Sequence, residues 1–320
     1  MDTLTTPLCE TLGIEHPVFL AGMGGVAYAE VCAAVSEAGG FGCIGAAGMD
    51  PDWIREQIQE VRRLTDKPFG VDVLTALPDQ VPAQAKVICE EGVAAFVAGL
   101  GVPGPVIEMC HEAGLKVFNL CGKVKHARRA EEAGVDVLVA QGTEAGGHTG
   151  KIGGMALVPQ IVDAVSAPVL AAGGLYDGRG LAAALSLGAQ GVWMGTRFIA
   201  SQEAHADDVY KHRIKEIDDE DTRITRCYSG KPMRVIDNPY AQSWEQRADE
   251  IQPFPAQFVS TFRDNAMKMA QPELIELDPD LDCMPCGQGA GGINDIPTCA
   301  EIVERVVSQA TAILTNLAPH

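Results

Sequence analysis

The stretch APVLAAGGLYDGRGLAAALSLGAQGVWMGTRF, residues 167–198, decides the fold. It holds two short apolar runs, one ending at Gly173-Gly174 and the other at Gly195-Thr196, with a helical pattern between them. Apolar runs without alternation are typical of parallel strands that are buried on both faces. The stretch therefore predicts two parallel strands, each followed by a glycine turn.

The same strand–helix unit recurs along the first two thirds of the chain. Glycine suits the end of each helical segment because it adopts the left-handed conformation at little cost. Amphipathic stretches such as 52–64 and 125–134 separate the strands. The other predicted strands lie in HPVFLAG (16–22), SEAGGFGCIGAA (36–47), KPFGVDVL (67–74), EEGVAAFVAGL (90–100), HEAGLKVFNLCG (111–122) and EEAGVDVLVAQG (131–142), which makes eight in all.

Eight βα units between about residues 16 and 200 predict an α/β fold, a closed (β/α)8 TIM barrel with its helices outside. A doubly wound open sheet is the alternative. Such a sheet would carry its dinucleotide-binding glycines after the first strand, whereas the richest glycine loops here follow the seventh and eighth. Barrels bind phosphate at that corner, so the barrel is preferred.

The βα rhythm stops after Phe198. Residues from about 200 to 290 carry acidic runs such as EIDDEDTR, but apolar residues such as Trp244 and Phe258 are dense enough to pack. We predict that 200–290 is a mostly helical insertion that caps the barrel mouth. Residues 1–199 and about 290–320 would form the barrel, with 297–314 as its last outer helix because of its apolar face at helical spacing.

Charge and composition exclude several kinds of partner. A formal net charge of −19 would repel nucleic acid and anionic membranes, so a bound phosphate must be held locally. The chain shows neither a secretory signal nor an apolar run of the ~20 residues that a membrane span requires. Most of the ten cysteines lie in apolar segments, as in a reducing compartment. We expect a soluble, cytoplasmic protein.

One CxxC pair, Cys283 and Cys286, suits a redox couple or half of a zinc site. It has no second CxxC and no paired histidines beside it in the sequence. We therefore predict no metal.

The two glycine loops of the opening stretch predict a phosphate site. Glycines let backbone amides approach a phosphate, and the helix opened by Asp177 would add the partial charge of its N-terminus. Arg197 would add a full charge. One such loop would be an ordinary turn, but two on the last adjacent strands favour phosphate.

QGTEAGGHTG, residues 141–150, directly follows the sixth strand and carries the predicted catalytic residue, His148. In a barrel this position faces the catalytic side. Histidine titrates near neutral pH and can act as base or acid toward a substrate on a cofactor ring. A lone histidine is more often structural; the flanking glycines at a strand end favour catalysis here.

These segments resemble the nitronate monooxygenase family, formerly called 2-nitropropane dioxygenases. The resemblance rests on HPVFLAGMGG, EAGGHTG, AAGGLYDGRGLAAALSLGAQGVWMGTRF and GQGAGGINDIPTCAEIV, and it is weakest from about 200 to 285. It implies an FMN-binding barrel with a helical lid. Gly22, Met23 and Gly24 would border the flavin, Gln141, Gly146 and Gly147 would line it beside His148, and Gly173, Gly174, Gly195 and Thr196 would hold its phosphate.

The chain departs from the family pattern at three places. Asp72 takes the position of an asparagine and would put a negative charge near the flavin edge, disfavouring an anionic reduced flavin. Leu120 stands where relatives can offer a lysine, although Lys123 is close enough to substitute, and Gly24 replaces a glutamine of some members. FMN remains expected, and the substrate stays open.

The family signature covers several reactions on small molecules. We expect an FMN-dependent oxidoreductase of the monooxygenase type, which oxidises alkyl nitronates with O2. The alternatives are an NAD(P)H-dependent quinone or enoyl-thioester reductase, or an acyl-CoA dehydrogenase, on the same barrel. A non-catalytic barrel that binds a phosphorylated ligand is an alternative of another class. The oligomeric state is open, with a homodimer as one candidate.

Overall fold

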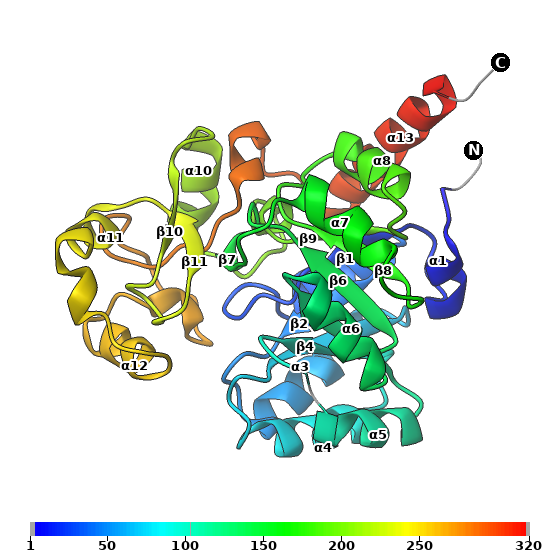
Figure 1. Ribbon diagram of the computed structural model, residues 1–320, viewed down its shortest axis with the longest axis horizontal. Helices are drawn as coiled ribbons and strands as arrows, with labels where there is room; N and C mark the ends of the chain where they lie inside the picture. The colour runs from blue at the N-terminus through cyan, green and yellow to red at the C-terminus, as the bar shows by residue number, and fades with distance from the viewer. Residues whose placement is uncertain (1–3, 103, 318–320) are drawn as a thin grey trace.

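The computed structural model describes residues 4–102 and 104–317, and its centre is an eight-stranded parallel sheet. The strand order is β1-β9-β8-β6-β5-β4-β3-β2, and a parallel bridge between Phe19 and Phe41 joins its two edges. The predicted TIM barrel is therefore confirmed (Figure 1). The strands are β1 (Val18–Leu20), β2 (Gly42–Gly45), β3 (Phe69–Leu74), β4 (Ala95–Gly99), β5 (Lys116–Cys121), β6 (Val137–Gln141), β8 (Val169–Ala172) and β9 (Val192–Met194).

Helices cover the outside of the barrel because each buries one apolar stripe. In α3 the buried residues are Ile54, Ile58 and Val61, and the side chain of Asp50 caps the helix by accepting from the Trp53 amide at 2.9 Å. The outer helices are α2 (Ala29–Glu37), α3 (Pro51–Leu64), α4 (Val81–Glu91), α5 (Gly104–Glu112), α6 (Val124–Glu132), α7 (Gly154–Val162), α8 (Gly178–Ser186) and α13 (Cys299–Leu317), with the short α9 (Thr196–Ile199) after β9.

The predicted final outer helix, α13, packs against α8 and α2. The contact with α8 is so close that a Cβ atom on Gly178 would lie 2.5 Å from the Val306 carbonyl oxygen. Although α13 has 19 residues, no helix in the described ranges is both long and apolar enough to cross a bilayer.

The barrel interior is filled with side chains. Phe19, Phe41, Phe118 and Trp193 form its aromatic centre, with Phe19 and Phe41 ring centroids 5.4 Å apart. Helix α1 (Pro7–Leu12) packs Leu8 and other apolar residues into the same cluster. With its interior filled, the barrel can accept a ligand only near an end.

The segment after α9 forms a body beside the barrel, on the left in Figure 1, which we call the cap. Its antiparallel sheet pairs β10 and β11 and then β11 with β7, a strand of two residues from the loop after β6. The strands β10 and β11 differ from the mostly helical insertion that the sequence predicts here. The cap elements are α10 (Asp208–Glu216), β10 (Thr222–Thr225), β11 (Met233–Ile236), α11 (Pro239–Ser243), α12 (Ala256–Arg263) and the 3-10 turns η1 (Glu245–Glu250), η2 (Lys268–Ala270) and η3 (Gln288–Gly292), with β7 at Gly147–His148.

Candidate active site

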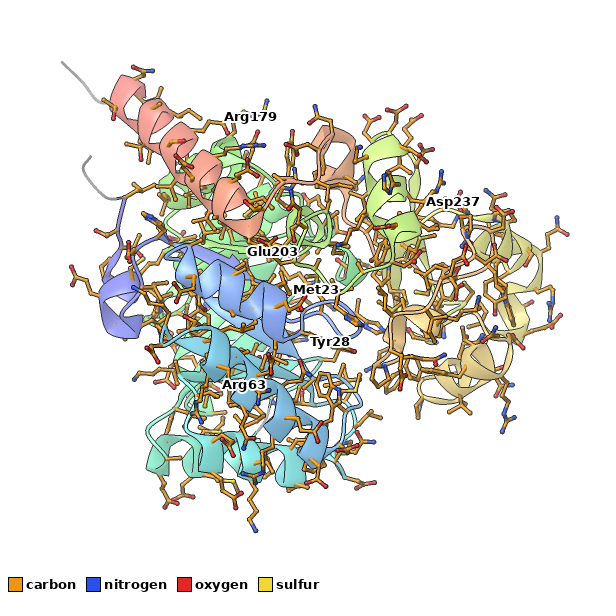
Figure 2. The ribbon with its side chains drawn as sticks, turned by 180° about the vertical axis from the view of Figure 1, so that it is seen from behind. Met23, Tyr28, Arg63, Arg179, Glu203 and Asp237 are labelled. Atoms are coloured by element: carbon orange, nitrogen blue, oxygen red, sulfur yellow. The ribbon has the colours of Figure 1, made fainter. Side chains whose placement is uncertain are left out.

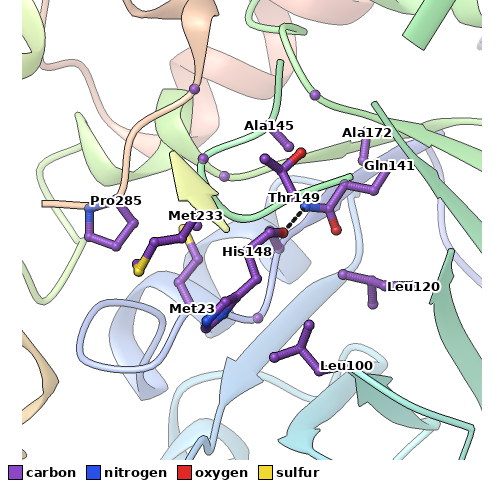
Figure 3. Close-up of a pocket in the computed structure, with 18 of the residues that line it drawn as sticks. Met23, Leu100, Leu120, Gln141, Ala145, His148, Thr149, Ala172, Met233 and Pro285 are labelled. Carbon is purple, nitrogen blue, oxygen red and sulfur yellow. Dashed lines mark hydrogen bonds between the residues drawn. The ribbon is translucent and has the colours of Figure 1, made fainter. Parts of the chain in front are cut away.

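A cavity of about 850 Å³ lies where the C-terminal ends of the barrel strands meet the cap. Met23 marks its barrel wall on the side that faces the cap (Figure 2). Leu100 and Leu120 lie on one side of it, and Met233 and Pro285 from the cap on the other (Figure 3). Every predicted site residue lines it: Gly22, Met23, Gly24, Asp72, Gln141, Gly146, Gly147, His148, Gly173, Gly174, Gly195 and Thr196. Their contacts with a ligand remain predictions.

The two predicted glycine turns lie in the same corner of this cavity. Gly173 and Gly174 have φ values of +100° and +72°, which other residues rarely adopt. A third glycine segment, from η3, packs on them: a Cβ atom on Gly289 would lie 3.1 Å from the Gly174 carbonyl oxygen. The Thr196 hydroxyl accepts from the Gly287 amide at 2.9 Å. We call this corner the glycine cradle; its exposed backbone fits a phosphate group.

Two expected contributions to the cradle are absent. The Arg197 guanidinium donates to Asp295 Oδ1 at 2.8 Å and to the Ala200 carbonyl at 2.7 Å, so its charge is already neutralised. At the start of α8, the Gly178 amide donates to Gln309 at 2.8 Å and the Arg179 amide to Asp177 at 3.0 Å. The expectation that Arg197 and this helix end would serve the phosphate was therefore wrong. The backbone of the two glycine turns therefore remains as the candidate phosphate-binding group.

The cap fixes His148. Strand β7 pairs with β11, and His148 stands opposite Met233. Its Nε2 lies 2.9 Å from Ser229 Oγ, and its carbonyl accepts from Gln141 Nε2 at 2.7 Å, the dashed line of Figure 3. Because the Ser229 hydroxyl donates to the Lys231 carbonyl at 3.2 Å, Nε2 carries the ring proton and Nδ1 is the acceptor.

The His148 imidazole is neutral at pH 7. Burial, and then the positive charge of Lys231, lower its pKa to about 4. A neutral imidazole can accept a proton, so the side chain is poised as a base rather than as an acid.

Asp72 lies under the loop after β1, where a Cβ atom on Gly22 would be 2.2 Å from the Asp72 Cβ. Burial raises the pKa of this carboxyl well above its ordinary value, and only the Gly99 amide opposes that shift. No ion pair within the described ranges includes it, so nothing offsets the cost of a buried charge. Burial therefore disfavours the negative charge that we expected at this place.

Asp72→Asn should therefore stabilise the protein near neutral pH. The folded state holds a proton that the unfolded chain releases above about pH 4, so wild-type stability falls as the pH rises from there toward the raised pKa. We expect a melting temperature several degrees above wild type at pH 7.5, since ~1 kcal/mol shifts it by roughly 2–4 °C. Calorimetry at pH 7.5 and pH 4 checks this; an equal gain at both pH values would contradict a neutral Asp72.

Some cavity residues were missed by sequence reasoning. Ser229 and Lys231 come from the cap. The sequence marks them only by the glycine between them, Gly230, which forms a turn with a φ of +83°. Gly287 and Gly289 belong to the glycine-rich GQGAGG run, which contributes to the family resemblance but carries no strand or helix pattern that would place it at the cavity.

The CxxC cysteines lie in different surroundings. Cys283 belongs to the cap core, whereas Cys286 donates to the Gly287 carbonyl at 3.6 Å beside the cradle. Both are free thiols whose pKa burial raises. Across the described residues, no three His, Cys, Asp or Glu side chains gather where they could hold a metal ion.

Comparisons with known proteins agree on one family. Residues 5–309 match the family model described as nitronate monooxygenase. The chain is 33% identical to (3aS,4S,5R,7aS)-5-hydroxy-7a-methyl-1-oxo-octahydro-1H-indene-4-carboxyl-CoA dehydrogenase of Rhodococcus jostii, covering 97% of each protein. It is 33% identical to a probable nitronate monooxygenase of Staphylococcus saprophyticus, covering 98% of this chain and 99% of that one. The structure of FabK from Thermotoga maritima superposes with a TM-score of 0.91 at 37% identity, covering 98% and 99% of the two chains.

Proposed function

Since this chain belongs to the nitronate monooxygenase family and is an oxidoreductase, we propose that it binds FMN and oxidises alkyl nitronates with O2. One observation carries the proposal: the glycine cradle and a neutral imidazole line the same cavity at the C-terminal ends of the strands. The family match removes the alternative of a non-catalytic barrel.

The residues of the cavity fit an FMN molecule. The cradle would hold the phosphate on backbone amides, and Gly22, Met23 and Gly24 would border the ring, the two glycines leaving room for it to approach the backbone. Burial raises the pKa of Asp72, and in its protonated form this side chain would donate a hydrogen bond to a ring acceptor. Bound flavin supplies the electron-transfer chemistry, and the protein supplies position and electrostatics.

His148 and Lys231 would act on the substrate. Nδ1 of the neutral His148 can take the proton from the carbon next to the nitro group of a bound nitroalkane, which generates the nitronate, or from the corresponding carbon of an acyl thioester, and Ser229 holds the ring in that orientation. A nitronate supplied as such has already lost that proton. Lys231 also lines the cavity, so its ammonium can stabilise an anionic nitronate.

A specific observation favours a second candidate, oxidation or reduction of an acyl thioester. Among the described residues that line the cavity, four are Lys or Arg and one, Asp72, carries a carboxyl group. That surplus exceeds what a small, singly charged nitronate requires. The Rhodococcus relative is named as a dehydrogenase of a carboxyl-CoA compound.

Oxygen consumption and flavin spectra separate these functions. The purified protein should be yellow and should take up O2 with propyl-2-nitronate. Anaerobic reduction of the bound flavin by NADH, NADPH or saturated acyl-CoA thioesters, followed by reoxidation with enoyl-CoA or a quinone, tests the alternatives. A yellow protein without oxygen uptake on nitronate would exclude the first function, and a protein that stays colourless with added FMN would exclude both.

The pH dependence of kcat/KM should report the perturbed histidine. Activity requires neutral His148, so the acid limb should fall near pH 4 rather than at the ordinary value of about 6.5. Lys231→Met removes the positive charge and should move the limb to higher pH, although burial keeps it below about 6.5. Lys231→Arg is the matched control and should leave the limb in place. An unmoved limb in Lys231→Met would contradict the electrostatic coupling.

A further inference from the structure

A buried arginine, Arg234 on β11, lies where the cap meets the barrel. Its side chain is only 6% exposed. The preceding residue, Met233, lines the cavity and stands opposite His148 in the pairing of β11 with β7 (Figure 3). Because successive side chains of a strand point to opposite faces, the Arg234 guanidinium lies on the other face of the cap sheet. Any effect of Arg234 on the chemistry therefore passes through the groups that it holds.

The guanidinium joins the cap to the loop that carries the proposed base. Nε and Nη2 of Arg234 donate to the Thr143 carbonyl at 3.2 and 3.1 Å, and Nη1 donates to Thr222 Oγ1 at 3.0 Å. Thr143 lies in the loop after β6, and Thr222 is the first residue of β10. The backbone of Arg234 pairs with Gly147, at the other end of the same loop. One residue thus holds both ends of the loop directly before His148.

Arg234 is also linked to the glycine cradle. The Cys286 amide donates to the Arg234 carbonyl at 3.3 Å, and the next amide, that of Gly287, donates to Thr196 Oγ1 at 2.9 Å. This segment packs directly on the loop, since a Cβ atom on Gly146 would lie 2.8 Å from the Gly287 nitrogen. A displacement of Arg234 would therefore change the loop and the cradle together.

The Arg234 guanidinium is buried without an acid to pair with. Within residues 4–102 and 104–317, no carboxylate oxygen lies within 4.0 Å of it. Burial lowers the pKa of Arg234, and the charge of Glu144 opposes that shift. A buried cation costs free energy, and hydrophobic side chains of similar volume are often at least as stable in such places. The free energy of folding thus gives no reason for an arginine here, whereas two donors on one loop carbonyl do.

Arg223, on the neighbouring strand β10, offers an internal comparison. It donates to the two Asp237 carboxylate oxygens at 2.7 and 2.9 Å and also pairs with Glu245. Both acids belong to the cap, Asp237 directly after β11 and Glu245 in η1. These contacts of Arg223 therefore hold the cap together, whereas those of Arg234 hold the loop of His148.

We propose that Arg234 is a positioning residue: by holding the Thr143 carbonyl and pairing with Gly147, it sets the place of His148 relative to the glycine cradle. The proposal rests on the proposed function, in which His148 is the base and the cradle holds the flavin phosphate. Placement matters because a displacement of ~1 Å can lower a rate about a hundredfold. Arg234 is therefore required for the rate of the chemical step rather than for binding of the substrate.

Hydrogen–deuterium exchange of the FMN-loaded protein tests whether Arg234 holds the loop. Arg234→Met removes the guanidinium but keeps an apolar stem, and Arg223→Met is the matched control. Backbone amides of 141–150 should exchange at least about tenfold faster in Arg234→Met, because the loop loses a hydrogen-bonded anchor, while those of β5 stay unchanged. In Arg223→Met the exchange of 141–150 should change less than about threefold.

Stopped-flow flavin reduction measures the consequence for the reaction. The substrate is whichever of a nitronate, a nitroalkane or an acyl thioester reduces the wild-type flavin. In Arg234→Met the saturated rate per bound flavin should fall at least about tenfold, with the half-saturating concentration changed less than about threefold. Arg223→Met should keep the wild-type rate. Arg234→Lys keeps one cationic donor for the Thr143 carbonyl, so its rate and its exchange should lie between those of Arg234→Met and wild type.

Several results would overturn the proposal. Wild-type exchange of 141–150 in Arg234→Met would do so, as would a wild-type rate. Equal losses in Arg223→Met would show only a loosened cap, and would also overturn it. If Arg234→Met does not fold, Arg234→Lys decides, and wild-type exchange and rate in that variant overturn the proposal. A wild-type flavin that no substrate reduces defeats the proposed function, and the exchange of 141–150 remains the test of Arg234.

Discussion

Replacement of His148 by alanine should lower turnover by about two to four powers of ten, the usual contribution of a general base. The backbone pairing of β7 with β11 and the bond from Gln141 to the His148 carbonyl do not use the imidazole. The variant should therefore fold, keep the cavity and remain yellow. Stopped-flow measurement of anaerobic flavin reduction isolates the step in which the base acts.

Ser229→Ala serves as the control for His148→Ala. It leaves the base in place but removes the oxygen that lies 2.9 Å from Nε2, so the ring loses its orientation rather than its proton affinity. We expect an intermediate loss of about tenfold, in line with one hydrogen bond of about 1–1.5 kcal/mol. A wild-type reduction rate in His148→Ala would remove this residue from the mechanism.

Gly195→Asp should abolish tight flavin binding. The φ of Gly195 is −104°, so another residue can adopt this backbone. The new Cβ would meet the movable Met23 Sδ at 3.3 Å and, at the ordinary contact distance of 3.6 Å, the Ala21 Cβ. The variant places a carboxylate in the cradle beside the phosphate. Two like charges ~4 Å apart repel by about 4 kcal/mol at a protein surface, which predicts a loss of at least about a hundredfold in affinity.

Gly195→Asn separates charge from size, because its side chain has the same shape without the charge. We expect it to weaken FMN binding less than about tenfold. Quenching of FMN fluorescence by the apoprotein gives both dissociation constants. If Gly195→Asp binds FMN as tightly as wild type, the phosphate does not lie at this turn.

Short-range patterns account for what sequence reasoning could predict. Eight apolar runs, five of which directly follow a helical stretch that ends in Ala-Gly or a similar small pair, predicted the barrel because strand and helix periodicity are local properties. Gly173-Gly174 and Gly195-Thr196 could be placed in one corner because parallel barrel strands all end on the same face.

The cap was only partly predictable. Apolar and polar residues alternate too weakly in its sequence to predict the strands β10 and β11. The second strand that pairs with β11 is β7, formed by the distant residues Gly147 and His148. The pairing joins segments about 85 residues apart, for which no local pattern exists.

The sequence by itself determined the barrel, the glycine turns and the presence of a histidine at the end of the sixth strand, because each follows from residue types a few positions apart. The tertiary structure decided the pKa shifts of the cavity side chains and which residues pair with them by hydrogen bonds or ion pairs. Arg197 is neutralised by Asp295, 98 residues away, and His148 is oriented by Ser229, 81 residues away. Burial raises the pKa of Asp72 well above its ordinary value. Charge and burial depend on what surrounds a group in space, and that is settled only when the chain has folded.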